Sequence, residues 1–271
     1  MPLVYDHFLP HIPPFLVVLA RIGGLFVFAP VLGSPAIPMR IKALLAVALT
    51  MAIYPTLDLH RAAQLQLTLA DMAPVMASEA LVGLALGLVA GLPMLSVQVG
   101  GLLMGQQMGL GLATIFNPAI DSEGDVVGQI LFFSALALFL AAGGLESLFK
   151  AVLISFNTLP LGGFSAADSP VALITGLVTS GFELAVRVAA PVFAILFVET
   201  VASGLIMKTA PQLNILSLGF PIRIMLALVV VYGSLTAIHE ASGDELAHAI
   251  RQGFEWVASL GSAHPTPQAG G

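Results

Sequence analysis

Apolar stretches of unequal length make up most of this chain. Six of them, 12–32, 43–53, 72–104, 126–149, 171–207 and 215–238, are separated by more polar sections. A membrane-spanning helix needs about 20 apolar residues. By this measure the stretch between Lys42 and Pro55 is too short, and those at 72–104 and 171–207 are too long for one span. We therefore predict an all-α, membrane-type fold of about six hydrophobic segments that form bent or broken helical hairpins.

Charged residues are too few to cover a soluble protein of this size. Of 271 residues, 9% are charged and 58% are hydrophobic, whereas soluble domains average about 25% charged residues. This composition excludes a soluble enzyme and a disordered chain. The net charge of −6 excludes a nucleic-acid-binding protein, which needs a basic surface. We interpret the chain as an integral membrane protein or as a subunit of a membrane-associated assembly.

Glycine and proline are frequent, with 27 and 18 residues, and this favours bent helices over straight ones. No Lys or Arg precedes Arg21, so the N-terminus lacks the basic region of a cleavable signal. We expect the first apolar segment to remain in the mature protein. We also expect a single integral domain over residues 1–260, followed by a disordered tail over 261–271.

Glycines recur at every fourth residue in two places. The first series is Gly83, Gly87 and Gly91, and the second begins at Gly101. On a helix, this spacing leaves one face bare and lets a second helix approach closely. We predict helix packing at these four positions. The alternative is that a glycine-rich chain produces such spacings by chance.

A stretch rich in glycine, glutamine and methionine follows the third apolar segment. It comprises Met104, Gly105, Gln106, Gln107, Met108, Gly109, Leu110 and Gly111. Methionine packs against irregular surfaces, and glutamines in apolar surroundings must find partners or water. This combination favours a flexible constriction or plug. The alternative is an ordinary loop or helix end.

Five charged residues lie inside apolar segments: Arg21, Glu79, Glu183, Arg187 and Glu199. Charges at such positions often have a function in membrane proteins. Glu183 and Arg187 are four residues apart and can pair on one helix face. For Glu79 and Glu199 the sequence offers no local partner. It leaves open an ion pair at a subunit contact or a role in proton or ion coupling.

Patterns typical of catalysis or metal binding are absent from the sequence. The chain has no cysteine, and no second histidine follows His239-Glu240 at the spacing that zinc requires. It contains neither a Gly-x-Ser-x-Gly elbow nor a nucleotide-binding Gly-x-x-x-x-Gly-Lys-Ser/Thr loop. We therefore expect no enzymatic activity, no cofactor and no metal.

Several short motifs occur in a specific order between residues 15 and 240. They lie at residues 20–26, 29–30, 37–40, 105–111, 117–118, 155–156, 159–162, 210–214 and 219–221. Together they resemble the FliR/SctT family of type III secretion export gate subunits. Residues 143–146 are more similar to the virulence branch, and residues 159–162 to the flagellar branch. Asn117 stands where the family often has an acidic residue.

This resemblance implies a core subunit of the flagellar export gate in the bacterial inner membrane, at the flagellar basal body. Its partners would be FliP-like and FliQ-like gate subunits, FlhB-like and FlhA-like export components, membrane lipid and unfolded protein substrates. Residues 105–118, including Phe116, correspond to a plug that closes the channel and moves to let substrates through. We assign Pro211, Gln212 and Asn214 to subunit contacts.

Three alternatives remain open at this point. The chain could belong to a virulence secretion gate, or it could be a structural membrane subunit without a role in a pore. It could also be a secondary transporter of small solutes that uses broken helices and a coupling carboxylate, Glu79 or Glu199.

Overall fold

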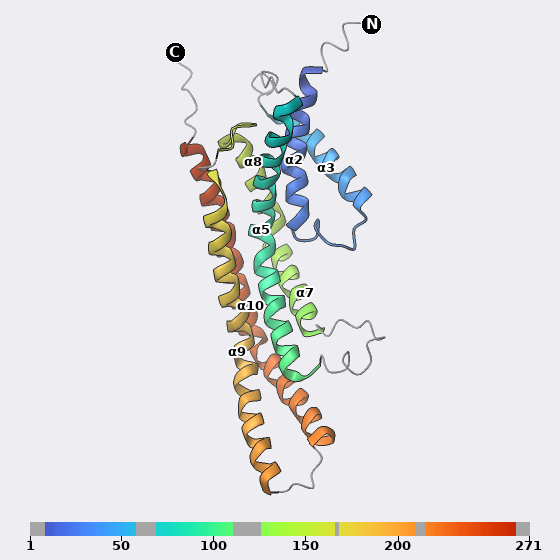
Figure 1. Cartoon of the computed structure of the whole chain (residues 1–271), viewed down its shortest axis with the longest axis vertical. Helices are drawn as coiled ribbons and strands as arrows, with labels where there is room; N and C mark the ends of the chain where they lie inside the picture. The colour runs from blue at the N-terminus through green and yellow to red at the C-terminus, as the bar shows by residue number, and fades with distance from the viewer. Residues whose placement is uncertain (1–8, 58–68, 111–125, 166–167, 210–214, 264–271) are drawn as a thin grey trace. The chain divides into compact units, whose positions relative to one another are not determined.

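Helices form the whole of the regular structure in the part of the chain that is described. The computed structural model describes residues 9–57, 69–110, 126–165, 168–209 and 215–263. Its α-helices (Figure 1) are α2 (Ile12–Phe28), α3 (Met39–Ile53), α5 (Leu69–Met108), α7 (Val126–Ala141), α8 (Gly144–Thr158), α9 (Val171–Thr209) and α10 (Ile215–Ala263). Short 3₁₀ turns occur at Leu9–His11 and Tyr54–Thr56. The predicted all-α class is confirmed.

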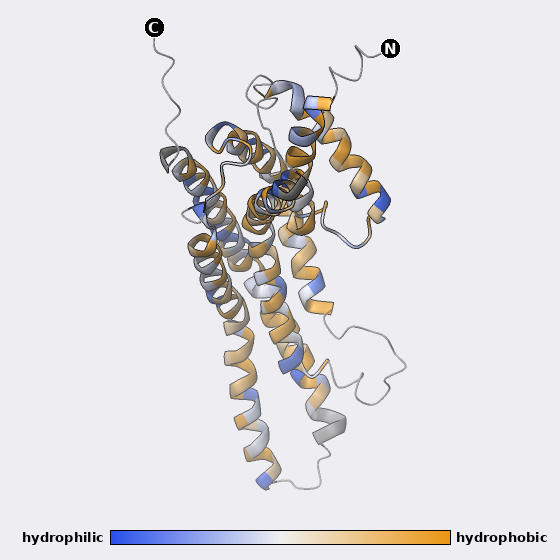
Figure 2. Ribbon diagram, turned by 45° about the horizontal axis from the view of Figure 1, so that its top comes forward, coloured by the Kyte–Doolittle hydropathy of each residue, from blue (hydrophilic) through white to orange (hydrophobic). Residues whose placement is uncertain are grey.

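Five of these helical segments are long and apolar enough to cross a membrane. They are Leu9–Phe28, Met39–Thr56, Asp71–Met108, Val171–Thr209 and Gly219–Leu260, and apolar residues cover long parts of them (Figure 2). The pair α7 and α8 makes a sixth candidate span, which is bent by 65°. The bend lies at Gly143, whose φ of +71° favours glycine. About six hydrophobic segments with a broken pair among them are therefore confirmed.

The breaks lie in other places than the segment lengths suggested. The stretches that were too long for one span do not fold back as hairpins, because α5 and α9 are continuous helices of 40 and 39 residues. Proline inside an apolar helix is tolerated where neighbouring groups satisfy the freed backbone, as at Pro191 in α9. Among the described segments, the break falls in 126–149, which contains no charge before Glu146. The short second segment gains length because α3 begins at Met39.

The helices group into two compact units, which are described separately. Unit 1 consists of Met1–Gly91, Gly143–Leu177 and His248–Gly271, and unit 2 of Leu92–Ala142 and Val178–Ala247. The core of unit 1 contains α2, the first part of α5 and α8, with fully buried side chains such as Val17, Leu25 and Leu86. The core of unit 2 contains Met94, Leu131, Phe139 and Val192.

The C-terminal helix extends slightly past the predicted end of the integral domain. Helix α10 ends at Ala263, three residues beyond the predicted boundary at residue 260. The rest of the predicted tail, residues 264–271, lies outside the described residues.

Candidate functional site

Glycines bring α2 and α5 of unit 1 into backbone contact. Each of the predicted packing positions Gly83, Gly87 and Gly91 lies against a backbone carbonyl of α2. A Cβ atom at Gly87 would lie 2.8 Å from the carbonyl oxygen of Leu25, and one at Gly91 would lie 2.5 Å from that of Phe28. Any side chain at these positions would force the two helices apart.

Glycine has the same effect on α2 itself and in unit 2. A Cβ atom at Gly24 of α2 would collide with the backbone of Ala80 in α5. In unit 2, a Cβ atom at Gly101 of α5 would lie 2.5 Å from the Cα of Gly128 in α7. The structure therefore places all four predicted packing glycines at contacts between helices.

Arg21 lies within the α2–α5 contact and is completely buried. Its Nε donates to Oε2 of Glu79 on α5 at 2.5 Å. Its Nη1 donates to the hydroxyl of Ser155 on α8 at 3.1 Å, and its Nη2 donates to the carbonyl of Leu159 at 3.3 Å. The guanidinium also lies 4.4 Å from the centre of the Phe156 ring, a cation–π distance.

Glu79 is also completely buried, and both of its carboxylate oxygens are used. Oε2 binds Arg21, while Oε1 accepts a hydrogen bond of 2.9 Å from the backbone N–H of Gly162. A buried charge is tolerated when it is paired and its remaining hydrogen-bonding groups are satisfied. The Arg21–Glu79 pair meets both conditions inside a single chain.

Sequence reasoning singled out Arg21 and Glu79 but did not pair them, because they belong to different helices and are 58 positions apart. It did not assign Ser155, Leu159 or Gly162 to a site. The sequence did contain an indication of these three residues, because they lie in two of the motifs that carry the family resemblance, at residues 155–156 and 159–162.

Glu199 has a partner within unit 2. Its Oε2 lies 3.4 Å from Nε of Arg223 on α10, and its Oε1 accepts a hydrogen bond from Ser203 at 2.7 Å. Nη2 of Arg223 donates to Thr200 at 2.8 Å. This pair is less buried than the first, since 28% of the Arg223 side chain is exposed.

Glu183 and Arg187 form an ion pair on the exposed surface of α9. Oε1 of Glu183 lies 2.9 Å from Nη2 of Arg187, and about two thirds of each side chain is exposed. The contact joins residues four positions apart on one helix, as the spacing indicated. Among the described residues, no group of three or more His, Asp or Glu is placed to hold a metal ion.

The first residues of the predicted plug form the last turns of α5. Met104 and Met108 are fully buried, whereas Gln106 and Gln107 are exposed. Gly109 ends the helix with φ of +83°. The N–H of Leu110 bonds to the carbonyl of Gly105, and the N–H of Gly109 bonds to that of Gln106, the pattern of a Schellman motif.

Several predicted positions lie outside the described residues. They are Gly111 and Phe116 of the plug, and Pro211, Gln212 and Asn214 of the predicted subunit contacts.

Large apolar side chains are exposed on several helices, among them α3, α9 and α10. On α3 these include Met39, Leu44 and Met51. Only 17% of the candidate span Met39–Thr56 is buried. On α9 and α10, Phe197 and Tyr232 are 71% and 80% exposed. These helices have apolar surfaces that the described part of the chain does not cover.

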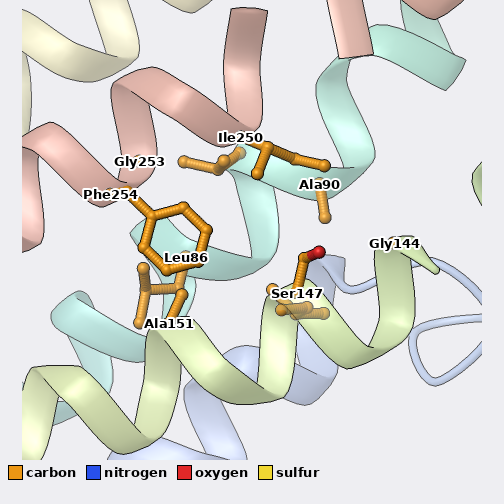
Figure 3. Close-up of a pocket in the computed structure, with 10 residues that line it drawn as sticks. Leu86, Ala90, Gly144, Ser147, Ala151, Ile250, Gly253 and Phe254 are labelled. Carbon is orange, nitrogen blue, oxygen red and sulfur yellow. The ribbon is translucent and has the colours of Figure 1, made fainter. Parts of the chain in front are cut away.

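Unit 1 also contains a small apolar pocket between α5, α8 and α10 (Figure 3). Leu86, Ala151 and Phe254 are among its lining residues. Its one hydroxyl, that of Ser147, already donates to the carbonyl of Gly143 at 3.2 Å. The pocket therefore lacks the convergent polar groups that orient a substrate.

Comparison with known proteins gives one family and several relatives. The family described as "Bacterial export proteins, family 1" matches residues 12–249. The flagellar biosynthetic protein FliR of Escherichia coli K12 is 30% identical over 247 residues, which cover 91% of this chain and 92% of that protein. FliR of Bacillus subtilis is 28% identical over 83% of this chain and 87% of its own length. The Yop proteins translocation protein T of Yersinia pestis is 25% identical over 80% of this chain and 85% of its own length.

Proposed function

The chain belongs to the bacterial export proteins, family 1, and from this premise we propose that it is a non-enzymatic core subunit of the flagellar type III export gate. It assembles with FliP-like and FliQ-like subunits in the inner membrane and works with FlhA-like and FlhB-like components. The family contains flagellar and type III export proteins. Identities of 30% and 28% to FliR of Escherichia coli and Bacillus subtilis, against 25% to the Yersinia pestis protein, support the flagellar branch over the virulence branch.

The observation that carries this proposal is the length of the apolar helices. At 1.5 Å per residue, α9 with its 39 residues is about 58 Å long. The hydrocarbon core of a bilayer is about 30 Å thick, and helices tilt by at most about 40°. Lipid therefore cannot cover the whole of this helix. Exposed residues such as Phe182, Phe197 and Leu205 support protein partners along the remainder.

Residues 105–118 form the plug in this proposal. The support is the end of α5, where two exposed glutamines follow a long apolar span and Gly109 stops the helix. Polar side chains there can bond to other chains or to water across a narrow channel. Movement of the plug then opens a path for unfolded substrates.

The solute-transporter hypothesis has no comparable support. It depends on a carboxylate that is available for coupling to ions or protons. Glu79 and Glu199 both have arginine partners within the chain.

Affinity purification tests the proposal. The tagged full-length chain is extracted from its own cells in a mild detergent, with an unrelated tagged membrane protein as the control. We expect FliP-like and FliQ-like chains to co-purify with it at a fixed ratio. A monodisperse homodimer without these chains would contradict the gate assignment.

A second experiment separates the two branches. The gene is deleted in its own strain and restored in wild-type form, and flagellar assembly and virulence secretion are measured. The proposal requires loss and recovery of flagella. Loss of virulence secretion alone would assign the chain to the virulence branch.

A further inference from the structure

Two backbone groups after α8 are left without partners by secondary structure: the carbonyl of Leu159, just before a turn, and the N–H of Gly162, inside that turn. Helix α8 ends at Thr158, and the last carbonyl groups of a helix have no partner within it. A turn then runs from Pro160 to Gly163, closed by a hydrogen bond of 2.9 Å between the N–H of Gly163 and the carbonyl of Pro160. Gly162, with φ of +74°, is its third residue, as in a type II turn.

Arg21 and Glu79 each bind one of these two backbone groups. The guanidinium donates to the carbonyl of Leu159, which is fully buried, and the carboxylate accepts from the N–H of Gly162. Leu159 is a buried residue, and a buried backbone group without a partner is costly. Gly162 is an exposed residue, and its N–H is held by a buried carboxylate. The ion pair thus supplies a donor to the first group and an acceptor to the second.

We propose that Arg21 and Glu79 form a clamp that fixes the path of the chain from α8 towards α9. In this clamp the placement of the two charges matters, because the donor must lie at the carbonyl of Leu159 and the acceptor at the N–H of Gly162. Ser155, which accepts from Arg21 and donates to the carbonyl of Val152, aligns the guanidinium with the end of α8. The clamp therefore positions the start of the connection from α8 to α9, in addition to linking α2 to α5.

The variant Glu79→Gln tests the role of the carboxylate. Glutamine keeps the length of the side chain but has one acceptor oxygen in place of two. The charged Arg21 will hold that oxygen, so the amide NH₂ group will face the N–H of Gly162. The measurement is hydrogen exchange at the Gly162 amide, read by mass spectrometry with fragmentation on the full-length chain in mild detergent.

We expect this amide to exchange about tenfold faster in Glu79→Gln, the effect of losing one hydrogen bond. The matched control is Glu183→Gln, the same chemical change in the exposed pair with Arg187, and it should leave Gly162 unchanged. Exchange within twofold of the wild-type rate in Glu79→Gln would overturn the proposal.

A charge swap provides a second test that does not depend on that variant folding. Arg21→Glu/Glu79→Arg restores opposite charges but places a carboxylate at the carbonyl of Leu159 and a guanidinium at the N–H of Gly162. We expect its melting temperature in detergent to lie below that of the apolar double variant Arg21→Met/Glu79→Leu, which adds no repulsion. The exposed swap Glu183→Arg/Arg187→Glu should melt like the wild type.

The opposite order, with the buried swap more stable than the apolar double variant, would overturn the clamp. The pair would then only link α2 to α5 by opposite charge. Neither experiment measures export, so the clamp and the proposed gate function can fail separately.

Discussion

Arg21 and Glu79 form a fully buried ion pair, with 2.5 Å between Nε and Oε2, although 58 positions separate them in the sequence. The pair lies between two helices whose backbones touch through glycine. The charged groups and the glycines of this region therefore depend on the same close approach of α2 to α5.

Removing one partner of the pair should be strongly destabilising. In Glu79→Ala, Arg21 would remain buried without a counter-charge, which costs about 3–5 kcal/mol. We expect a large loss of monodisperse full-length chain after detergent extraction. The control Glu183→Ala breaks an exposed pair, which contributes about 0–1 kcal/mol, and should be recovered like the wild type. Equal recovery of both variants would contradict the structural role of the pair.

Adding a methyl group at the helix contact should separate α2 from α5. In Gly87→Ala the new Cβ would meet the carbonyl of Leu25 at 2.8 Å, and overpacking of this kind costs about 1–3 kcal/mol. We expect a lower melting temperature of the full-length chain in detergent. Gly23→Ala on α2 is the matched control, because nothing lies within 4 Å of its Cβ position.

The control should shift in the other direction. Alanine in a helix is about 0.5–1 kcal/mol more favourable than glycine, so Gly23→Ala should melt at or above the wild-type temperature. A melting temperature for Gly87→Ala that is not below that of Gly23→Ala would refute the close contact.

Deleting residues 106–111 should open the assembled gate. If residues 105–118 plug the channel, the deletion removes the exposed glutamines and the glycine that ends α5. We expect cells or proteoliposomes with the variant complex to leak ions and small molecules. The complex with Gly23→Ala, which leaves this end of α5 intact, serves as the sealed control. A tight complex after the deletion would remove the plug from the proposal.

Glu199→Gln should leave export intact. The side chain of Arg223 is 28% exposed and that of Glu199 is 10% exposed, so water can reach the arginine when it loses its counter-charge. Ser203 can still donate to the remaining amide oxygen. We expect a stability loss of about 1–3 kcal/mol, because Arg223 loses its acceptor, and wild-type flagellar assembly. Loss of uptake of a defined solute with export unchanged would instead favour the transporter hypothesis.

The sequence predicted the fold class better than it predicted which helices are continuous and which are bent. Segment length and low charge were enough for an all-α membrane-type chain. Proline was a poor guide to breaks, because Pro191 lies inside a continuous α9, while the bend between α7 and α8 occurs at Gly143. Hydropathy is averaged over many residues, so it cannot detect a bend that depends on one residue with left-handed backbone angles, such as Gly143.

The candidate site was predictable in its parts but not in its connections. Charges in apolar segments indicated Arg21 and Glu79, and the four-residue spacing indicated Gly83, Gly87 and Gly91. The partners Ser155 and Gly162 belong to a distant part of the sequence. Pairing them with α2 and α5 requires knowledge of how α8 packs, which no local pattern contains.

The glycine series on α5 also determines its axial register on α2. Three positions along the contact admit no side chain. If α5 moved by four residues in one direction, Glu79 would take the place of Gly83, and in the other direction Leu95 would take the place of Gly91. Of these three registers, only the observed one places glycine at all three positions. The two helices therefore cannot slide by one turn while they stay in contact, and a motion that separates their backbones would also pull Glu79 away from Arg21.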